Sequence, residues 1–273
     1  MKKVLSVILA AVMMFSVVAL FAACSKDTDK KDEDTSNNTS AVADVDLITQ
    51  KGKIVIGITE YEPMNYKDSN GEWTGFDTEY AQAVAQKLGV DAEFVVVDWD
   101  NKFLELDAKS IDCIWNGMTI TDEVKANSDV TNPYVMNAQV VVTTQDVQAK
   151  YTTISEMKEL KFAAEAGSAG EAAIKDAGLT CTAVADQSAA LMEVASGSAD
   201  ACVIDITMAN AMTGEGTSYA NLVQAEKLAE EQYGIACRKN SDLIAKINEI
   251  TDELKADGTM DKLAEKYELT LIK

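Results

Sequence analysis

Residues 111–115 read Ile-Asp-Cys-Ile-Trp, and residues 199–204 read Ala-Asp-Ala-Cys-Val-Ile. In both phrases an acidic residue at a turn leads into a short apolar strand. Each phrase lies in a half of the chain that begins with a predicted strand and helix. In the first half these are the strand Lys53–Ile58 and the amphipathic helix that ends at Gly89. The repeated layout predicts two similar lobes with facing crevices.

Strand-like and helix-like segments alternate through the folded part of the chain. Because this order brings strands together in parallel sheets with helices on both faces, the sequence predicts an α/β fold. Ligands then bind in the loops at the carboxyl ends of the strands. The predicted strands are residues 53–58, 93–97, 111–115, 134–143, 161–164, 181–185, 201–204 and 233–237, and the predicted helices are residues 76–88, 171–177, 188–196, 206–212, 243–254 and 263–267.

The N-terminus has the three parts of an export signal. Two lysines follow Met1, residues 4–23 are apolar except for two serines, and two alanines precede Cys24. We expect residues 1–23 to be a lipoprotein signal peptide and Cys24 to carry a lipid that tethers the protein outside a membrane. An uncleaved anchor helix is the alternative, because a run of this length can span a bilayer. Residues 24–45 are polar and are expected to form a disordered linker.

The composition excludes several classes of function. The chain has no histidine, which rules out Ser-His-Asp and Cys-His catalysis and removes the commonest metal ligand. Its formal net charge is -21, and without Lys2 and Lys3 it is -23 from Cys24 onward. A protein this acidic lacks the positive charge that binding to nucleic acid phosphates requires. Catalysis by carboxylates or lysine stays open, and we expect neither a cofactor nor a metal.

Four cysteines follow Cys24, namely Cys113, Cys181, Cys202 and Cys237. Each lies in an apolar, strand-like run, and no two form the close pair that a zinc site or a redox motif uses. We expect them to be small core residues. A disulfide, for example between Cys181 and Cys202, is the alternative in a protein outside the cell.

A series of short phrases runs in order from Lys53 to the end of the chain. The phrases are Ile56-Gly57 through Tyr61-Glu62-Pro63-Met64, Asn70-Gly71-Glu72-Trp73-Thr74-Gly75-Phe76-Asp77, Val97-Asp98-Trp99-Asp100, Asn116-Gly117-Met118-Thr119-Ile120-Thr121, Asn132-Pro133-Tyr134, Glu165-Ala166-Gly167-Ser168, Ala199-Asp200-Ala201 to Asp205, and Tyr233-Gly234-Ile235-Ala236. In this order they resemble the solute-binding proteins of ABC importers for polar amino acids, bacterial family 3. Each phrase is weak alone, and the ordered set carries the resemblance.

The resemblance implies an α/β fold of the type II periplasmic binding proteins, with two Rossmann-like lobes joined by two crossing hinge strands. Lobe 1 would comprise residues 46–138 and 239–273, and lobe 2 residues 145–232. The hinge strands would lie near residues 139–144 and 233–238. A ligand would close the cleft between the lobes by a hinge motion.

The resemblance also implies which aromatic residues contact the ligand. Tyr61 and Trp99 match the pair that sandwiches the ligand side chain, and aromatic faces suit both apolar and cationic groups. Trp115 precedes a binding segment and is a further candidate. The alternative for Tyr61 is a surface position, and for the two tryptophans a place in the core.

Three acidic residues are expected near the cleft, Glu60, Glu165 and Asp205. Asp205 matches the family aspartate that receives the α-amino group of the ligand, because a charge-assisted bond is strong in a closed cleft. The alternative for Asp205 is the N-cap of the helix that begins at residue 206.

Two segments match those whose amides and hydroxyls hold the ligand carboxylate in the family. The candidate residues are Asn116, Gly117, Thr119, Ser168 and Ala169. Exposed N–H groups at a helix start suit an anion. Ordinary glycine turns ahead of helices are the alternative.

The sequence departs from the family at a carboxylate contact. Relatives read Thr-x-Thr-Pro-Glu-Arg, whereas residues 119–124 here read Thr-Ile-Thr-Asp-Glu-Val, so that Val124 stands at the arginine position. The only arginine is Arg238, which is expected at the surface, and Lys125 cannot reproduce the fork of an arginine even if it turns into the vacant place. Losing the pair of an arginine and the ligand carboxylate lowers the affinity roughly a hundredfold.

Two ligand classes follow from this departure. In the reading we prefer, an amino acid binds with its carboxylate held by the amides of Thr119 and Ala169 and the hydroxyl of Ser168. In the alternative, the ligand is a cationic amine or another non-standard solute. A dehydratase-like enzyme on the same fold is a further alternative, since carboxylates supply a general acid and base. The missing arginine clamp argues against it.

The resemblance implies a binding protein that acts with an ABC permease and its ATPase, without chemistry of its own. We expect a monomer, held by the lipid on Cys24 at the extracellular face of the cell membrane. The lipid tether fits a Gram-positive type of bacterium, because without an outer membrane a free binding protein diffuses away.

Overall fold

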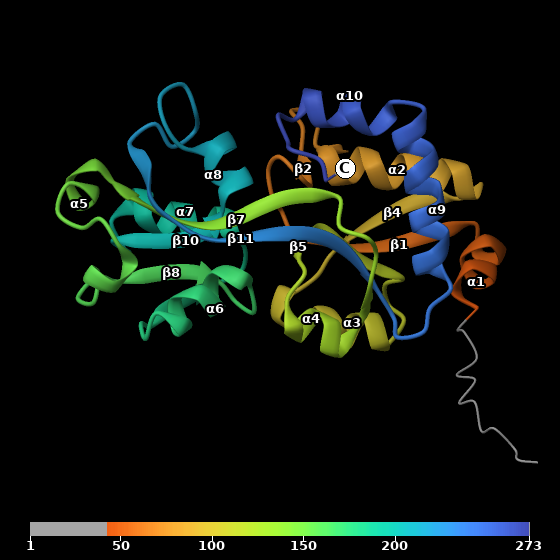
Figure 1. Ribbon diagram of the computed structural model, residues 1–273, viewed down its shortest axis with the longest axis horizontal. Helices are drawn as coiled ribbons and strands as arrows, with labels where there is room; N and C mark the ends of the chain where they lie inside the picture. The colour runs from red at the N-terminus through yellow and green to blue at the C-terminus, as the bar shows by residue number, and fades with distance from the viewer. Residues whose placement is uncertain (1–42, 273) are drawn as a thin grey trace, which may run out of the picture. The chain divides into compact units, whose positions relative to one another are not determined.

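The structure, a computed structural model, describes residues 43–272, which belong to one unit of residues 39–273 (Figure 1). The expectations for residues 1–23, for Cys24 and for most of the linker lie outside the described residues. The fold is α/β, with one large mixed sheet and a small hairpin of β2 and β3. The strand order in the large sheet is β4-β1-β5-β11-β7-β10-β8-β9, and β6 pairs with β11.

We call the part built on β1, β4 and β5 lobe 1. Strand β1 pairs in parallel with β4 on one side and β5 on the other. Figure 1 shows α2 and α10 on one face of these strands and α3 and α4 on the other. The elements of lobe 1 are α1 (Asp44–Lys51), β1 (Lys53–Ile58), β2 (Tyr66–Lys67), β3 (Trp73–Thr74), α2 (Phe76–Leu88), β4 (Asp91–Val96), a 3-10 turn (Trp99–Asn101), α3 (Lys102–Asp107), β5 (Cys113–Thr119), α4 (Asp122–Asn127), β6 (Asp129–Val130), α9 (Leu243–Ala256) and α10 (Thr259–Lys266).

Lobe 2 repeats this plan on a smaller scale. Strand β8 pairs in parallel with β9 and with β10, and α6 and α7 lie on opposite faces of these strands (Figure 1). The elements of lobe 2 are α5 (Gln145–Gln148), a 3-10 turn (Ile154–Glu156), β8 (Phe162–Glu165), α6 (Ala169–Asp176), β9 (Cys181–Val184), α7 (Gln187–Ser196), β10 (Ala201–Asp205) and α8 (Ile206–Met212).

Two long antiparallel strands, β7 (Val135–Thr144) and β11 (Leu222–Cys237), run side by side between the lobes (Figure 1). β7 pairs with β10 in lobe 2, and β11 pairs with β5 in lobe 1. The two-lobed fold with crossing strands is therefore as predicted. The predicted strand of residues 233–237 is too short, because the mostly polar stretch of residues 222–232 also pairs with β7 through its backbone.

The core lies on both faces of the sheet, as the alternation of side chains along β1 requires. Ile54, Ile56 and Ile58 are buried in the cluster that contains the apolar faces of α2 and α9. Val55 points the other way and packs in the cluster that includes Leu106 of α3. The apolar run of β1 therefore holds helices on both of its faces.

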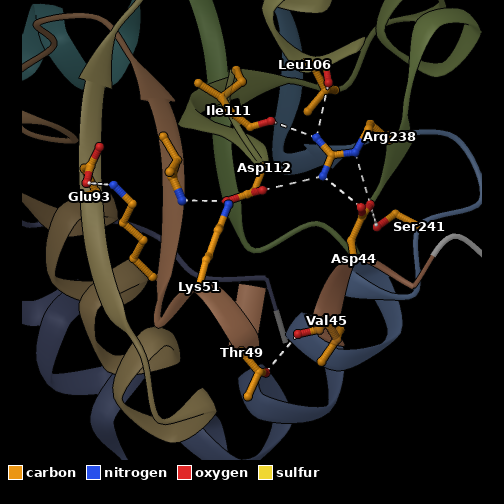
Figure 2. A network of polar contacts seen from close by, with 12 residues as sticks. Asp44, Val45, Thr49, Lys51, Glu93, Leu106, Ile111, Asp112, Arg238 and Ser241 are labelled. Carbon is orange, nitrogen blue, oxygen red and sulfur yellow. Dashed lines mark hydrogen bonds and ion pairs between the residues drawn. The ribbon is translucent and has the colours of Figure 1, made fainter. Parts of the chain in front are cut away.

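The N-terminal end of the fold corrects two expectations. Helix α1 begins at Asp44, so the predicted linker ends two residues too late. Asp44 is fully buried and pairs with Arg238, whose Nη2 lies 2.9 Å from Asp44 Oδ1. Arg238 also donates to the carbonyl oxygens of Leu106 (3.2 Å) and Ile111 (2.7 Å), and its Nη2 lies 3.6 Å from Asp112 Oδ1 (Figure 2). The surface position expected for Arg238 is wrong, because these carbonyls and carboxylates satisfy a guanidinium that is 7% exposed.

The four cysteines of the described region are free thiols. Cys113, Cys202 and Cys237 are buried, as expected of core residues, and Cys181 is half-buried. A bond between Cys181 and Cys202 is excluded, because β8 lies between their strands and places them about 10 Å apart.

Within residues 43–272, no helix has the length and apolar character needed to cross a membrane. The same residues contain no group of three or more His, Cys, Asp or Glu side chains that could hold a metal ion.

Candidate ligand-binding site

A cavity of about 390 Å³ lies between the two lobes. Lobe 1 contributes the 3-10 turn, the end of β5 and the start of α4. Lobe 2 contributes the ends of β8 and β10 and the start of α6, and β11 contributes two residues. The lining residues are Trp99, Lys102, Asn116, Gly117, Met118, Thr119, Thr121, Asp122, Glu123, Val124, Glu165, Gly167, Ser168, Ala169, Ala172, Ala173, Asp176, Gln187, Asp205, Ala229 and Glu231.

Asp205 is the last residue of β10 and is 5% exposed. Its carboxylate accepts hydrogen bonds from the side-chain amides of Asn137, Gln139 (2.9 Å) and Gln187. Burial and, to a lesser extent, the charge of Glu231 raise its pKa to about 7, although hydrogen bonds to the carboxylate oppose this shift. The side chain makes no N-cap bond to α8, so the alternative role considered for Asp205 is absent.

Glu231 on β11 was not predicted for the site. Its Oε2 accepts from the Thr119 hydroxyl (2.9 Å), from Gln139 Nε2 (3.0 Å) and from Asn137 Nδ2 (3.3 Å). Since Asn137 and Gln139 also donate to Asp205, two amides on β7 join two carboxylates. Glu231 lies in the polar part of β11 that the apolar pattern did not identify as a strand.

Glu165 ends β8, next to β10, and is 2% exposed. Its Oε1 has no hydrogen-bond partner among the described residues. Burial raises its pKa to about 8, opposed by the Thr59 hydroxyl and reinforced by the charge of Asp205. At neutral pH the group is therefore mostly protonated and can donate as well as accept.

The start of α6 offers hydrogen-bond donors to the cavity. Ser168 is the N-cap, and its hydroxyl oxygen accepts from the backbone N–H of Glu171 (3.1 Å). The hydroxyl proton stays available, as does the N–H group of Ala169 in the first turn, which has no intrahelical acceptor. Gly170 is buried, and a side chain does not fit there, because a Cβ would lie 2.4 Å from the carbonyl oxygen of Val203. This close contact holds the helix start against β10.

The predicted strand of residues 111–115 ends too early, because Asn116–Thr119 continue β5. The extension arises because Met118 and Thr119 pair with β11. The N–H of Gly117 donates to Asp77 Oδ2 (2.5 Å), and the side-chain amide of Asn116 donates to the Thr59 hydroxyl (2.8 Å). These two donors are already used inside lobe 1.

Trp99 and Lys102 form one edge of the cavity. Trp99 is 7% exposed at the start of the 3-10 turn, which Asp98 caps by accepting from Asp100 N. The Lys102 ammonium lies 4.9 Å from the Trp99 ring centre and donates to the carbonyl oxygen of Gly167 in lobe 2 (3.0 Å). Burial lowers the pKa of Lys102, although nearby carboxylates oppose this effect.

Residues 54–270 match the family of bacterial extracellular solute-binding proteins, family 3. The chain belongs to this family. The L-cystine-binding protein TcyJ of Escherichia coli (strain K12) is 28% identical over 224 residues, which cover 81% of this chain and 84% of that protein.

Two solved structures of amino-acid-binding proteins are similar in fold and sequence. The arginine-bound form of truncated ArgBP from T. maritima has 32% identity and a TM-score of 0.72, and the match covers 77% of this chain and 99% of that chain. The ancestral amino acid-binding protein AncCDT-1, a precursor of cyclohexadienyl dehydratase, has 33% identity and a TM-score of 0.75, with coverage of 82% and 99%. The family confirms the two-lobed solute-binding fold predicted from the ordered phrases.

Eight of the eleven residues predicted for ligand binding line the cavity of this solute-binding protein. The exceptions are Glu60, Tyr61 and Trp115. Glu60 is exposed outside the cavity wall. Trp115 is fully buried in lobe 1 with its ring 4.7 Å from that of Tyr80, because its position in β5 faces the core cluster under α2. The core alternative for Trp115 is therefore the one the structure has.

Tyr61 lies behind the cavity wall. It is 1% exposed, and a Cβ on Gly117 would lie 2.6 Å from its ring. Its hydroxyl is hydrogen-bonded to the hydroxyls of Thr207 in lobe 2 and Tyr233 on β11. Tyr61 therefore connects the lobes next to the cavity, and the surface alternative does not hold.

Val124 lines the cavity and packs with Trp99 and Met118. Lys125 is exposed and outside the cavity wall, so it does not occupy the vacant position. The cation that sequence reasoning missed is Lys102. Its place three residues after Trp99, at the start of a helix, was the available signal.

Proposed function

We propose that this protein is a lipid-anchored extracellular subunit of an ABC importer that captures an α-amino acid in the cavity between its lobes. The observation that carries the proposal is Asp205, a buried carboxylate held by three side-chain amides in a cavity that also receives the start of α6. The α-ammonium would bind Asp205, and the α-carboxylate would bind near Ser168 and Ala169. Membership of a family of solute-binding proteins supports this assignment.

The ligand side chain would lie against Trp99. An indole face suits both apolar and cationic chains. Glu231 and Asp205 place carboxylates in this cavity, and Glu165 adds a carboxyl group that can accept a hydrogen bond, so that side chains with hydrogen-bond donors or a positive charge are favoured. The relatives named for L-cystine and for arginine support this preference, because each of these amino acids carries two cationic groups.

Calorimetry with the twenty standard L-amino acids and L-cystine tests the proposal. We expect at least one to bind with a 1:1 stoichiometry, and Asp205→Asn to weaken that binding. Binding of amines with no heat from any amino acid would instead support the alternative of a cationic amine ligand. The acidic residues of the cavity are the observation that favours a cationic amine as the alternative ligand.

The proposed lipid anchor is supported by the sequence of residues 1–24, and the proposed importer partners are supported by membership of the family. Labelled fatty acid should be incorporated into the exported protein and lost in Cys24→Ala, which should be released from the cells. A permease and its ATPase would bind the closed form, and transport of the ligand should require them. An exported wild-type chain without lipid would contradict the anchor while leaving ligand capture intact.

A dehydratase-like activity is the second candidate, because Glu165 combines burial with a pKa raised to about 8, which suits a general acid. The similarity to a precursor of a dehydratase adds to this candidate. We favour binding without chemistry, since the named relatives are binding proteins. Mass spectrometry of small carboxylic acids after incubation with the protein would detect loss of water if the enzyme reading is correct.

A further inference from the structure

Lys102 is the only lysine or arginine among the residues that line the cavity. It is the first residue of α3, and its side chain is buried, with the whole residue 4% exposed. Lysine is rarely buried in this way without a carboxylate partner. Among the described residues, no carboxylate oxygen lies within ion-pair distance of its ammonium. The cavity therefore contains one buried positive charge that no acidic side chain neutralises directly.

The ammonium of Lys102 is held in place by neutral groups. It donates to the carbonyl oxygens of Trp99 and Gly167, each at 3.0 Å, and lies 4.9 Å from the ring centres of Trp99 and Phe103. An ammonium has three protons, so one donor remains. The two carbonyls and the two rings orient the group without cancelling its charge.

The ammonium of Lys102 lies next to the free hydrogen-bond donors at the start of α6 in lobe 2. Gly167, whose carbonyl oxygen Lys102 contacts, directly precedes Ser168, the N-cap of α6. The lysine and the first turn of α6 thus border the same part of the cavity, and both favour an anion. The other ionisable groups that line the cavity are all carboxyl groups, those of Glu165, Asp205 and Glu231 and the exposed ones of Asp122, Glu123 and Asp176. A zwitterion carries the two charges that this arrangement complements.

We propose that Lys102 binds the α-carboxylate of the ligand and selects free amino acids against their uncharged carboxyl derivatives. This inference rests on the proposed function and adds the residue that determines its specificity. Because the ammonium also contacts Gly167 across the cleft, the ligand carboxylate would join a contact that already connects the lobes. Binding of the carboxylate and closure of the cleft would then favour each other.

The test compares an amino acid with its own carboxamide. The L-amino acid that binds most tightly in the calorimetric panel is measured again as the free acid and as the carboxamide, with wild type, Lys102→Met and Lys102→Gln. Wild type should prefer the free acid by about 10- to 100-fold, the range expected for a hydrogen bond between charged groups. Both variants should bind the acid and the carboxamide with nearly equal affinity. Thermal unfolding shows whether each variant is folded.

Lys125→Met is the matched control, because it removes the same charge from an exposed position outside the cavity and should keep the preference. A purely structural role for Lys102 would weaken acid and carboxamide alike and leave their ratio unchanged, which would overturn the inference. A wild-type protein that binds both forms equally would also overturn it, while leaving the proposed function standing. Failure of every amino acid to bind would contradict the proposed function itself.

Discussion

The hydroxyl of Tyr61 in lobe 1 is hydrogen-bonded to the hydroxyl of Thr207 in lobe 2. Tyr233, on the crossing strand β11, is hydrogen-bonded to both. Three hydroxyls from the two lobes and the hinge therefore meet beside the cavity. Since this cluster exists only when the lobes are together, it stabilises the closed arrangement relative to an open one.

Tyr61→Phe removes one hydroxyl from this cluster and keeps the ring that packs against Gly117. We expect ligand affinity to fall about 3- to 10-fold, the range expected for one net hydrogen bond, with most of the change in the dissociation rate. Tyr80→Phe is the control, because the Tyr80 hydroxyl bonds to Thr251 within lobe 1. Stopped-flow dissociation measures both variants, and equal rates for wild type and Tyr61→Phe would contradict a role in closure.

Asp205→Asn replaces the carboxylate that faces the cavity with an amide of similar shape. We expect amino-acid affinity to fall by about 100-fold, because a charge-assisted bond is lost and the new amide N–H groups oppose the amides that now donate to Asp205. Asp146→Asn removes a charge from an exposed position on α5 and should leave affinity unchanged. Isothermal titration measures both, and unchanged affinity in folded Asp205→Asn would remove Asp205 from the binding site.

The pH dependence of stability should report Glu165. Its pKa in the folded state is raised to about 8 from a reference value of 4.5, so between these pH values the folded chain holds a proton that the unfolded chain has lost. The free energy of unfolding therefore falls as pH rises through this window. Asp77 and Asp205, with pKa values raised to about 7, act in the same direction.

Glu165→Gln should remove the part of this pH dependence that belongs to Glu165. Without ligand, we expect the variant to be more stable than wild type at pH 8, by on the order of 1 kcal/mol or more, and similar to wild type at pH 4.5. Glu159→Gln, at an exposed position, controls for the change in net charge. Urea unfolding at the two pH values measures the difference, and a constant gap between variant and wild type would contradict the assignment.

The buried pair of Asp44 and Arg238 should contribute far more to stability than an exposed pair. Removing one partner, as in Asp44→Asn, leaves a guanidinium without its charge partner and should lower the free energy of unfolding by about 3–5 kcal/mol. An exposed pair for comparison is that of Lys53 and Glu93, at 2.7 Å, whose side chains are 45% and 46% exposed. Lys53→Met should change stability by at most about 1 kcal/mol. Equal effects in urea unfolding would contradict this account of the arginine.

The sequence predicted the elements whose apolar pattern is strong. Strand β1 and helix α2 are in place, because their buried positions repeat with the period of their structure. The first part of β11 was missed because its pairing with β7 depends on backbone groups and leaves the side chains polar. Helix α1 was missed because the burial of Asp44 depends on Arg238, which lies 194 residues away in the sequence.

The candidate site divides in the same way. Asp205, Ser168 and Trp99 were identified because short phrases mark them. Lys102 and Glu231 were not, because their place in the cavity depends on how α3 and β11 pack against the other lobe. For Trp115 the sequence left a place in the core and a place in the cavity open, since the face of β5 on which it lies depends on the pairing with β11.

The most direct test of the account is a crystal structure of the protein purified with its natural small molecule, which mass spectrometry identifies in the same sample. We predict an α-amino acid between the lobes, with its ammonium within hydrogen-bond distance of Asp205 and its carboxylate at Lys102 and the start of α6. A ligand bound elsewhere, or one in the cavity that makes no contact with Asp205, would contradict it.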